Sequence, residues 1–253
     1  MKARKRFGQN FLQDPQLIDR IISVISPEKG QSIVEIGPGR GAITMPLVDS
    51  GCALTVIEID RDLAEQLRNL YPGISLIEAD VLKFDFGQLG DNIRVVGNLP
   101  YNISTPLLFK LFKRLKQIRD MYFMLQLEVV QRLVAEPNTN HYGRLSVMSQ
   151  YYCDATLQFT VPPEAFIPQP KVTSAIVRLQ PKQARTLADD EERFANLVNQ
   201  AFSMRRKTLR NALKGFVAQH AFEVLDIDPK RRPETLSLED FIRLANFKED
   251  TES

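Results

Sequence analysis

The most constraining feature of this chain is the regular alternation of strand and helix patterns between Ser32 and about Leu179. The apolar runs that we expect to form parallel strands are Ser32–Ile36, Ala53–Ile59, Ile74–Glu78, Ile93–Gly97 and Met121–Leu127. Alternation of this length predicts a parallel sheet with helices on both faces. Two further strands, Thr156–Val161 and Ser174–Leu179, are joined by a proline-rich loop without a helix. They predict a seven-stranded sheet with one antiparallel strand.

The pattern changes after Pro181, where strand signals stop. Acids at Asp189–Glu192 favour the start of a helix, because they complement its dipole. Helical spacing then continues to a last segment at Leu238–Leu244. A chain of 253 residues is long enough for one large domain and a small one. We therefore expect an α/β domain over residues 1–183 and a small all-helical domain over residues 184–253.

The net charge of +2 conceals two basic clusters. The first cluster consists of Lys2, Arg4, Lys5 and Arg6, and the second of Arg205, Arg206, Lys207, Arg210 and Lys214. Such clusters on a near-neutral chain indicate a polyanionic partner, although a solvated surface is the alternative for either one.

Several other classes of protein are disfavoured. No apolar run approaches the length that spans a bilayer, and the basic start is not followed by an apolar region typical of a signal peptide. The two histidines, His141 and His220, are far apart, and no metal-ligand spacing is present. We expect a cytoplasmic protein without a metal site, a monomer that does not associate with membranes.

A glycine turn follows the first predicted strand in the segment Val34-Glu35-Ile36-Gly37-Pro38-Gly39-Arg40-Gly41. The turn lies at the carboxyl end of the strand, where α/β sheets bind ligands, and its glycines let the backbone approach a ligand closely. Dinucleotide binding favours Gly-x-Gly-x-x-Gly over a pyrophosphate. Here the third glycine comes one residue early, which favours a nucleoside without a phosphate, S-adenosylmethionine.

Two acids at the ends of later strands strengthen this interpretation. Glu58 ends the second strand and is placed to accept hydrogen bonds from ribose hydroxyls. Asp80 follows the third strand and is placed to accept from an adenine amine. Ordinary strand-end turn residues are the alternative for both positions.

The segment Asn98-Leu99-Pro100-Tyr101 follows the fourth strand. The Asn98 side-chain carbonyl and the Leu99 backbone carbonyl provide acceptors for the N–H groups of an exocyclic amine. Pro100 fixes the turn, and Tyr101 offers a ring on which a base can stack. The combination predicts methylation of an amino group on a flipped base.

A second aromatic face is expected from Phe166, in the proline-stiffened loop Phe166–Val172. The alternative for Phe166 is that its ring only fills the edge of the core.

At this point the chain resembles the KsgA (RsmA) family of small-subunit ribosomal RNA adenine dimethyltransferases, nearly end to end. The segments that carry the resemblance are Lys5–Leu12, Glu35–Gly39, Asn98–Thr105, Phe166–Leu179 and Arg205–Leu213. The resemblance implies a Rossmann-like methyltransferase sheet with a helical RNA-binding domain. It also implies S-adenosylmethionine as cofactor, with S-adenosylhomocysteine as product. The implied substrate is a pair of adjacent adenosines, each dimethylated at N6, near the 3′ end of 16S rRNA in an assembling small subunit.

The resemblance also implies site residues, with Gln9 and Asn10 closing over the methionine end of the cofactor. The expected cofactor-binding residues are Gln9, Asn10, Leu12, Gly37, Gly39, Glu58, Asp80, Val81 and Asn98. The expected catalytic residues are Asn98, Leu99, Pro100, Tyr101 and Phe166. The expected RNA-binding residues are Lys5, Arg6, Arg205, Arg206, Lys207 and Arg210.

Two positions depart from the family pattern: Leu127 stands where a lysine is expected, and Lys110 stands where a histidine is common. Three alternatives to the implied function remain open. They are an Erm-type methyltransferase of large-subunit rRNA, a DNA adenine methyltransferase, and a non-catalytic ribosome-assembly factor on the same fold.

Overall fold

The computed structural model describes residues 9–183 and 186–248. The chain forms two compact units. The first runs to Val130 and adds Asp154–Pro181, and the second consists of Gln131–Cys153 and the chain from Lys182 onward. We describe each unit by itself.

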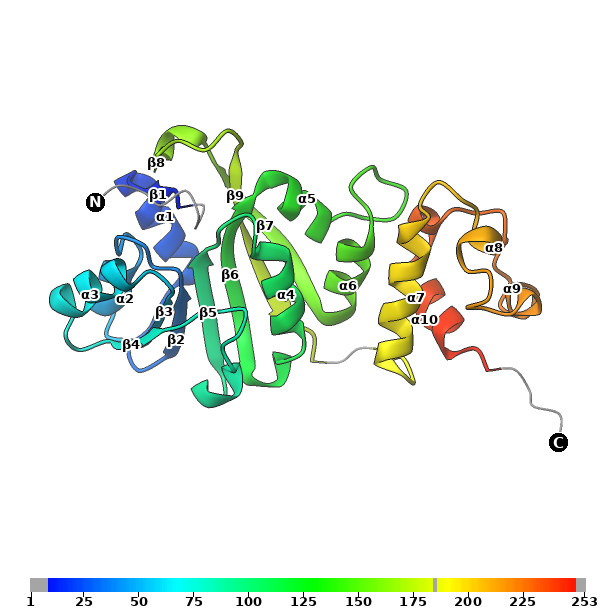
Figure 1. The fold of residues 1–253 in the computed structure, drawn as a ribbon, viewed down its shortest axis with the longest axis horizontal. Coiled ribbons are helices and arrows are strands. Elements are labelled where there is room, and N and C mark those ends of the chain that lie inside the picture. The colour runs from blue at the N-terminus through cyan, green and yellow to red at the C-terminus, as the bar shows by residue number, and fades with distance from the viewer. Residues whose placement is uncertain (1–8, 184–185, 249–253) are drawn as a thin grey trace. The chain divides into compact units, whose positions relative to one another are not determined.

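A seven-stranded sheet forms the centre of the first unit (Figure 1). Its strands in chain order are β2 (Ser32–Ile36), β3 (Ala53–Glu58), β4 (Ser75–Glu78), β5 (Ile93–Asn98), β6 (Ile118–Gln126), β7 (Cys153–Val161) and β9 (Ser174–Pro181). The strands lie in the order β4-β3-β2-β5-β6-β9-β7. The pairs from β4 to β6 are parallel, and β9 runs antiparallel to β6. The predicted fold class, a mostly parallel Rossmann-like sheet with an antiparallel strand, is confirmed.

The register of these strands brings their carboxyl ends to one edge of the sheet. Ile36 of β2 lies opposite both Ile57 of β3 and Gly97 of β5. Glu58 of β3 lies opposite Glu78 of β4. The residues that follow each strand therefore meet at this edge, which is where parallel α/β sheets place their ligands.

Helices cover both faces of the sheet. Those in the first unit are α1 (Pro15–Ile25), α2 (Thr44–Asp49), α3 (Arg61–Leu70) and α4 (Ser104–Phe112), while α5 (Leu127–Leu133) includes the junction of the two units. On one face, Ile33 of β2 belongs to the same core cluster as Ile21 of α1 and Leu47 of α2. The opposite face is also buried, because Val34, the next residue of β2, is only 2% exposed.

A small second sheet, not predicted from the sequence, joins two distant segments. Strands β1 (Phe11–Leu12) and β8 (Phe166–Ile167) pair antiparallel, and the Gln13 N–H donates to the Ala165 carbonyl at 2.9 Å. Each strand has only two residues, which is too short for any periodic pattern. The pairing holds the chain around Asn10 near the ligand edge of the main sheet.

The second unit is mainly helical in its described residues. Its helices are α6 (Arg144–Tyr152), α7 (Glu191–Ser203), α8 (Leu209–Ala212), α9 (Gln219–Val224) and α10 (Leu238–Asn246). Residues 131–153, which the sequence pattern predicts to lie in the α/β domain, group with this unit in the structure. The reason is apolar packing: the Tyr151 ring of α6 lies 4.4 Å from the Phe194 ring of α7. The Tyr142 hydroxyl also donates to the Leu236 carbonyl at 3.0 Å.

Candidate active site

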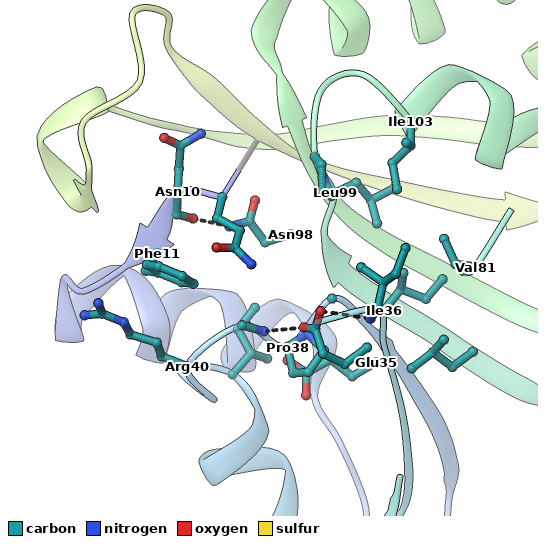
Figure 2. A pocket seen from close by; sticks show the side chains of 18 of the residues that line it. Asn10, Phe11, Glu35, Ile36, Pro38, Arg40, Val81, Asn98, Leu99 and Ile103 are labelled. Carbon is teal, nitrogen blue, oxygen red and sulfur yellow. Dashed lines mark hydrogen bonds between the residues drawn. The ribbon is translucent and has the colours of Figure 1, made fainter. Parts of the chain in front are cut away.

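An open pocket of about 250 Å³ lies at the carboxyl edge of the main sheet (Figure 2). Its walls come from the ends of β2, β3 and β5, the residues after β4, and the segment that contains β1. The predicted site residues that line it are Gln9, Asn10, Leu12, Gly37, Gly39, Glu58, Asp80, Val81, Asn98, Leu99, Pro100 and Tyr101. The structure therefore brings both predicted motifs, some sixty residues apart in the chain, into one cavity.

The glycine turn after β2 forms the floor of this pocket. Gly37 and Gly39 have φ values of 65° and 59°, a region that side chains with a Cβ rarely occupy. A Cβ at Gly39 would lie 3.1 Å from the Phe11 ring, so the turn also needs the space. The Gly37 N–H donates to the Ile57 carbonyl at 2.9 Å, which ties the turn to β3.

Glu58 presents a buried carboxylate to the pocket, with only 5% of the residue exposed. It accepts backbone N–H bonds from Gly39 at 3.3 Å and from Ile59 and Asp60, both at 2.9 Å. Burial raises the pKa of Glu58 above its ordinary value, and these three bonds oppose the rise. The carboxylate is thus held in one orientation before any ligand binds.

Glu35 is a second buried acid of the pocket and was not among the predicted site residues. It is 2% exposed and accepts a 2.7 Å hydrogen bond from the Thr44 hydroxyl. Burial raises the pKa of Glu35 from its ordinary 4.5 to about 7; the Thr44 bond opposes this, and Glu58 adds to it. The only signal in the sequence was an acid inside a buried strand, directly before the glycine turn.

Asp80 and Val81 form the wall after β4. Asp80 is half-buried, and its Oδ1 accepts the Leu82 N–H at 2.9 Å. Val81 is 6% exposed and, in Figure 2, lies near the apolar side chains of Ile36 and Leu99. Lys110 is one of the departures from the family pattern. Its ammonium group donates to the Leu82 carbonyl at 2.8 Å, which helps to fix the segment after β4.

The segment before β1 covers one side of the pocket. The Gln9 amide donates to Asp60 Oδ2 at 3.1 Å, and the Asn10 carbonyl accepts the Asn98 Nδ2–H at 3.1 Å. Leu12 follows within the core at 6% exposed. The expected RNA-binding residues Lys5 and Arg6 lie outside the described residues.

The Asn98 side chain is oriented by its contact with Asn10 (Figure 2). Only the amide nitrogen can donate to a carbonyl, so the bond assigns Nδ2 to this contact and leaves Oδ1 as an acceptor for another group. Leu99 is 1% exposed, and its N–H donates to the Met124 carbonyl of β6 at 3.2 Å. The start of the motif is thereby fixed to the sheet.

Tyr101 is half-buried at the rim of the pocket. Its hydroxyl lies 2.9 Å from the Oγ of Ser174. Ser174 is the first residue of β9 and is 1% exposed. The Tyr101 backbone carbonyl accepts the Ser104 hydroxyl at 3.1 Å. The ring is therefore anchored at both ends, a constraint that the sequence did not reveal because Ser174 is distant in the chain.

Phe166 does not face the pocket in this structure. It is 2% exposed, belongs to the core cluster that contains Leu12, and is absent from the described lining residues. Alternation along the short strand β8 turns Phe166 inward and the next residue, Ile167, outward at 54% exposed. The expected second stacking face is thus replaced here by the core-filling alternative.

The second basic cluster lies within the described residues. Arg205, Arg206, Lys207 and Arg210 are all exposed. Arg205 donates to the Asn140 carbonyl at 3.0 Å, whereas Arg210 lines a separate pocket of the second unit.

The charges around the first pocket discriminate between classes of ligand. Glu35, Glu58 and Asp80 are three acids in its lining, and Arg40 is the single basic side chain among the described lining residues. The Arg40 guanidinium lies 4.5 Å from the Phe11 ring centroid. An acid-rich lining opposes a pyrophosphate and suits a nucleoside that carries positive charge.

The sheet order, the glycine turn and this pocket define a Rossmann-like methyltransferase. Comparison with known proteins identifies the family. A sequence model of the ribosomal RNA adenine dimethylase family matches residues 1–250. The chain is 54% identical to the ribosomal RNA small subunit methyltransferase A of Acinetobacter baylyi, over 97% of this chain and 92% of that protein. It is 52% identical to the protein of that name from Vibrio cholerae, over 99% and 95%. The chain therefore belongs to the ribosomal RNA adenine dimethylase family, as the resemblance predicted, and is an S-adenosylmethionine-dependent methyltransferase.

Solved structures agree with this assignment. A dimethyladenosine transferase from Plasmodium falciparum matches with a TM-score of 0.81 and 26% identity, over 92% of this chain and 95% of that one. The 23S rRNA methyltransferase ErmE matches with a TM-score of 0.72 and 26% identity, over 93% and 98%. In the described residues, no helix has the length and apolar character needed to cross a membrane.

Proposed function

We propose that this protein dimethylates two adjacent adenosines at N6 near the 3′ end of 16S rRNA, in an assembling small ribosomal subunit. The observation that supports this most directly is the pocket that combines a glycine turn and buried acids with the Asn98 motif. Relatives that are 52–54% identical carry the small-subunit name, whereas ErmE is 26% identical. This difference favours small-subunit rRNA over the large-subunit substrate of the Erm type.

The pocket residues fit S-adenosylmethionine, which supplies an electrophilic methyl group when it is bound. Three amide bonds to Glu58 use three of its roughly four acceptor positions, so one remains for a ribose hydroxyl. Asp80 has one oxygen engaged by Leu82, and we assign the other to the adenine amine. Gly37 and Gly39 leave room for the methionine end, and Gln9, Asn10 and Leu12 cover it.

The target amine is held by the Asn98 motif. An adenine amino group is a poor nucleophile, because its lone pair is delocalised into the ring. Asn98 Oδ1 and the Leu99 carbonyl accept its two N–H groups and favour the tetrahedral nitrogen that attacks. Pro100 fixes the turn between these acceptors and Tyr101, on which the flipped base stacks. Because the amine becomes acidic once the methyl is attached, no strongly basic residue is needed to remove its proton.

The remaining assignments concern partners and location. We assign contacts with rRNA phosphates to Lys5, Arg6, Arg205, Arg206, Lys207 and Arg210. The protein acts in the cytoplasm and as a monomer in this proposal. The second candidate, a ribosome-assembly factor without catalysis, is disfavoured because Glu58, Asp80 and Asn98 all line the pocket.

Methyl transfer to isolated subunits tests the proposal. The protein is incubated with methyl-labelled S-adenosylmethionine and undermethylated small subunits, and in parallel with large subunits, and mass spectrometry locates the label. We expect dimethyladenosine at two adjacent positions near the 3′ end of the small-subunit RNA. Label confined to large-subunit RNA would assign the protein to the Erm type. Absence of label from both, with cofactor binding intact by calorimetry, would favour the assembly factor.

A further inference from the structure

A second pocket lies entirely within the helical unit. It has a volume of about 970 Å³. Its lining comes from the residues around the start of α7, from α8 and α9 with the loop between them, and from the end of α10. None of its residues belongs to the candidate active site. Its chemistry therefore needs a separate explanation.

One side of this pocket is cationic. Arg210 and Lys214 are exposed, and the structure shows no ion pair for either of them within residues 9–183 and 186–248. The nearby Arg193 is also exposed, and its Nε–H donates to the Ala245 carbonyl at 2.8 Å. Arg210 and Lys214 are thus cations of the lining whose side chains have neither an ion pair nor a hydrogen bond within the described residues.

The two acids of the lining are already engaged. Asp189 forms an ion pair with Lys248 at 3.1 Å. Asp190 caps α7 and accepts the N–H groups of Glu192 and Arg193, both at 2.9 Å. Lys248 offsets part of the Asp189 charge in this exposed pair, and the cap holds the Asp190 carboxylate at the start of α7.

Aromatic rings and side-chain amides form the rest of the wall. Phe216 and Phe247 are half-buried lining residues. The Arg193 guanidinium lies 5.6 Å from the Phe216 ring centroid, and the His220 and Phe247 ring centroids are 5.3 Å apart. Asn211 and Gln219 supply exposed amide groups, which can both donate and accept hydrogen bonds. Cations, rings and amides in one cavity match the three parts of a nucleotide: its phosphate, its base face and its base edge.

We propose that this pocket binds one unpaired nucleotide of RNA, with its base against Phe216 or Phe247 and its phosphate at Arg210 and Lys214. The proposal rests on the proposed function, because rRNA is the polyanion that this enzyme meets. It adds a site that holds RNA through a single extruded nucleotide, apart from the adenosine at the active site. Duplex RNA does not fit, since pairing and stacking leave no base face to contact a ring. An acidic protein segment would satisfy the two cations but would leave the rings and amides without a role.

Charge-neutralising variants of the full-length protein test the phosphate contact. The double variant Arg210→Gln/Lys214→Gln is compared with Lys230→Gln/Arg232→Gln, which removes the same charges from exposed residues of the same unit outside the pocket. Binding is measured by fluorescence anisotropy with a short unstructured RNA and with a duplex of equal length. We expect the pocket variant to lose about tenfold more affinity for the unstructured RNA than the control does, and to flatten its salt dependence. Equal losses for the two double variants would overturn the proposal.

Substitution of the ring tests the base contact. Phe216→Leu keeps an apolar side chain but removes the stacking face, and we expect about a tenfold weaker complex with unstructured RNA and an unchanged salt slope. Thermal unfolding shows whether the variant folds, and calorimetry shows whether it still binds S-adenosylmethionine. A folded Phe216→Leu and a folded Phe247→Leu that both keep full affinity would contradict a role for base stacking. If the ring variants no longer bind unstructured RNA more tightly than duplex RNA, that result would support a role for base stacking.

The two proposals fail in distinguishable ways. Wild-type protein that binds unstructured RNA through the pocket without methylating subunits would retain the nucleotide site and overturn the proposed function. Active wild-type protein with pocket variants equal to their controls would overturn the nucleotide site alone.

Discussion

The two pockets of this protein are built in opposite ways. In the pocket at the sheet edge, polar groups are already bonded to one another: Glu58 to three backbone amides, Asn98 to Asn10, and Glu35 to Thr44. In the pocket of the helical unit, the available cations Arg210 and Lys214 are exposed and project from α8 and the loop after it. The first pocket has its geometry set before binding, whereas the second offers charge that a ligand must organise.

This difference distinguishes a site suited to methyl transfer from a site suited to RNA binding. A methyl transfer depends on the orientation of the reacting groups, and misplacement is costly. Attraction of an RNA strand depends on charge and stacking, which tolerate variation in position but respond to salt. Changes in the first pocket should therefore alter turnover or cofactor affinity without altering salt dependence. The opposite is expected for the second pocket.

The largest effect is expected from Asn98→Ala. Loss of the amine acceptor should lower turnover about 100- to 1,000-fold, by analogy with the loss of a preorganised hydrogen-bonding group in other active sites. Affinity for S-adenosylmethionine should change far less, because most cofactor contacts remain. Single-turnover methylation and calorimetry measure the two quantities separately. Asn69→Ala, at an exposed position of α3, is the matched control. Turnover within a few-fold of wild type would mean that another group accepts from the amine.

The next largest effect concerns Glu35, which was not among the predicted site residues. Because the pKa of Glu35 rises from 4.5 to about 7 on folding, the folded protein binds more protons than the unfolded chain between these values. The free energy of unfolding should therefore fall as pH rises through this window, by about 3 kcal/mol from this group. Glu35→Gln keeps an acceptor for Thr44 but has no charge to bury.

Urea unfolding at pH 5 and pH 8 measures this contribution. We expect the free energy of unfolding of Glu35→Gln to increase relative to that of wild type as pH rises from 5 to 8. Glu65→Gln, at an exposed position of α3, should show no such increase. Equal pH profiles for wild type and Glu35→Gln would show that burial at this position does not penalise the charge.

A somewhat smaller effect is expected from Glu58→Gln. An amide in place of the carboxylate loses a charge-assisted bond to a ribose hydroxyl, and it also places an NH₂ group near backbone donors. We expect affinity for S-adenosylmethionine to fall about 10- to 100-fold. Glu78→Gln is a close control, because Glu78 pairs with Glu58 in the sheet but lies outside the pocket. Calorimetry measures the affinity of both variants for S-adenosylmethionine. Similar losses of affinity would show that Glu58 does not bind the cofactor.

The parts of the site that the sequence could predict are those that follow strands of the main sheet. The glycine turn, Glu58 and Asn98 all follow strands of the sheet, and the periodicity of those strands was readable, so their meeting at one edge followed from topology. The pairing of Phe11–Leu12 with Phe166–Ile167 was not readable, because it depends on contacts between distant two-residue strands. The inward position of Phe166 follows from that pairing, which is why the expected stacking ring proved to be buried.

The second unit was harder to predict for a related reason. Its helical character followed from residue spacing, but nothing local indicated that residues 131–153 would group with it. That grouping comes from contacts such as the one between Tyr151 and Phe194, between residues far apart in the sequence. Its pocket likewise collects residues from Asp189 to Lys248, of which only Arg210 and Asn211 belong to a segment that carried the family resemblance.

The smallest effect expected lies at the rim of the first pocket, where Tyr101 meets Ser174. If the hydrogen bond between their hydroxyls orients the ring for the incoming base, Tyr101→Phe and Ser174→Ala remove the same interaction. Each variant should raise KM for small subunits by about fivefold, consistent with about 1 kcal/mol for a neutral hydrogen bond. The double variant should be no worse than either single one, because the two losses are not independent. Ser174→Thr retains the hydroxyl and should restore KM, while affinity for S-adenosylmethionine stays constant throughout. Additive losses in the double variant would show that the two hydroxyls act separately, and preorganisation in this pocket would then end at Asn98 and not extend to the ring that receives the base.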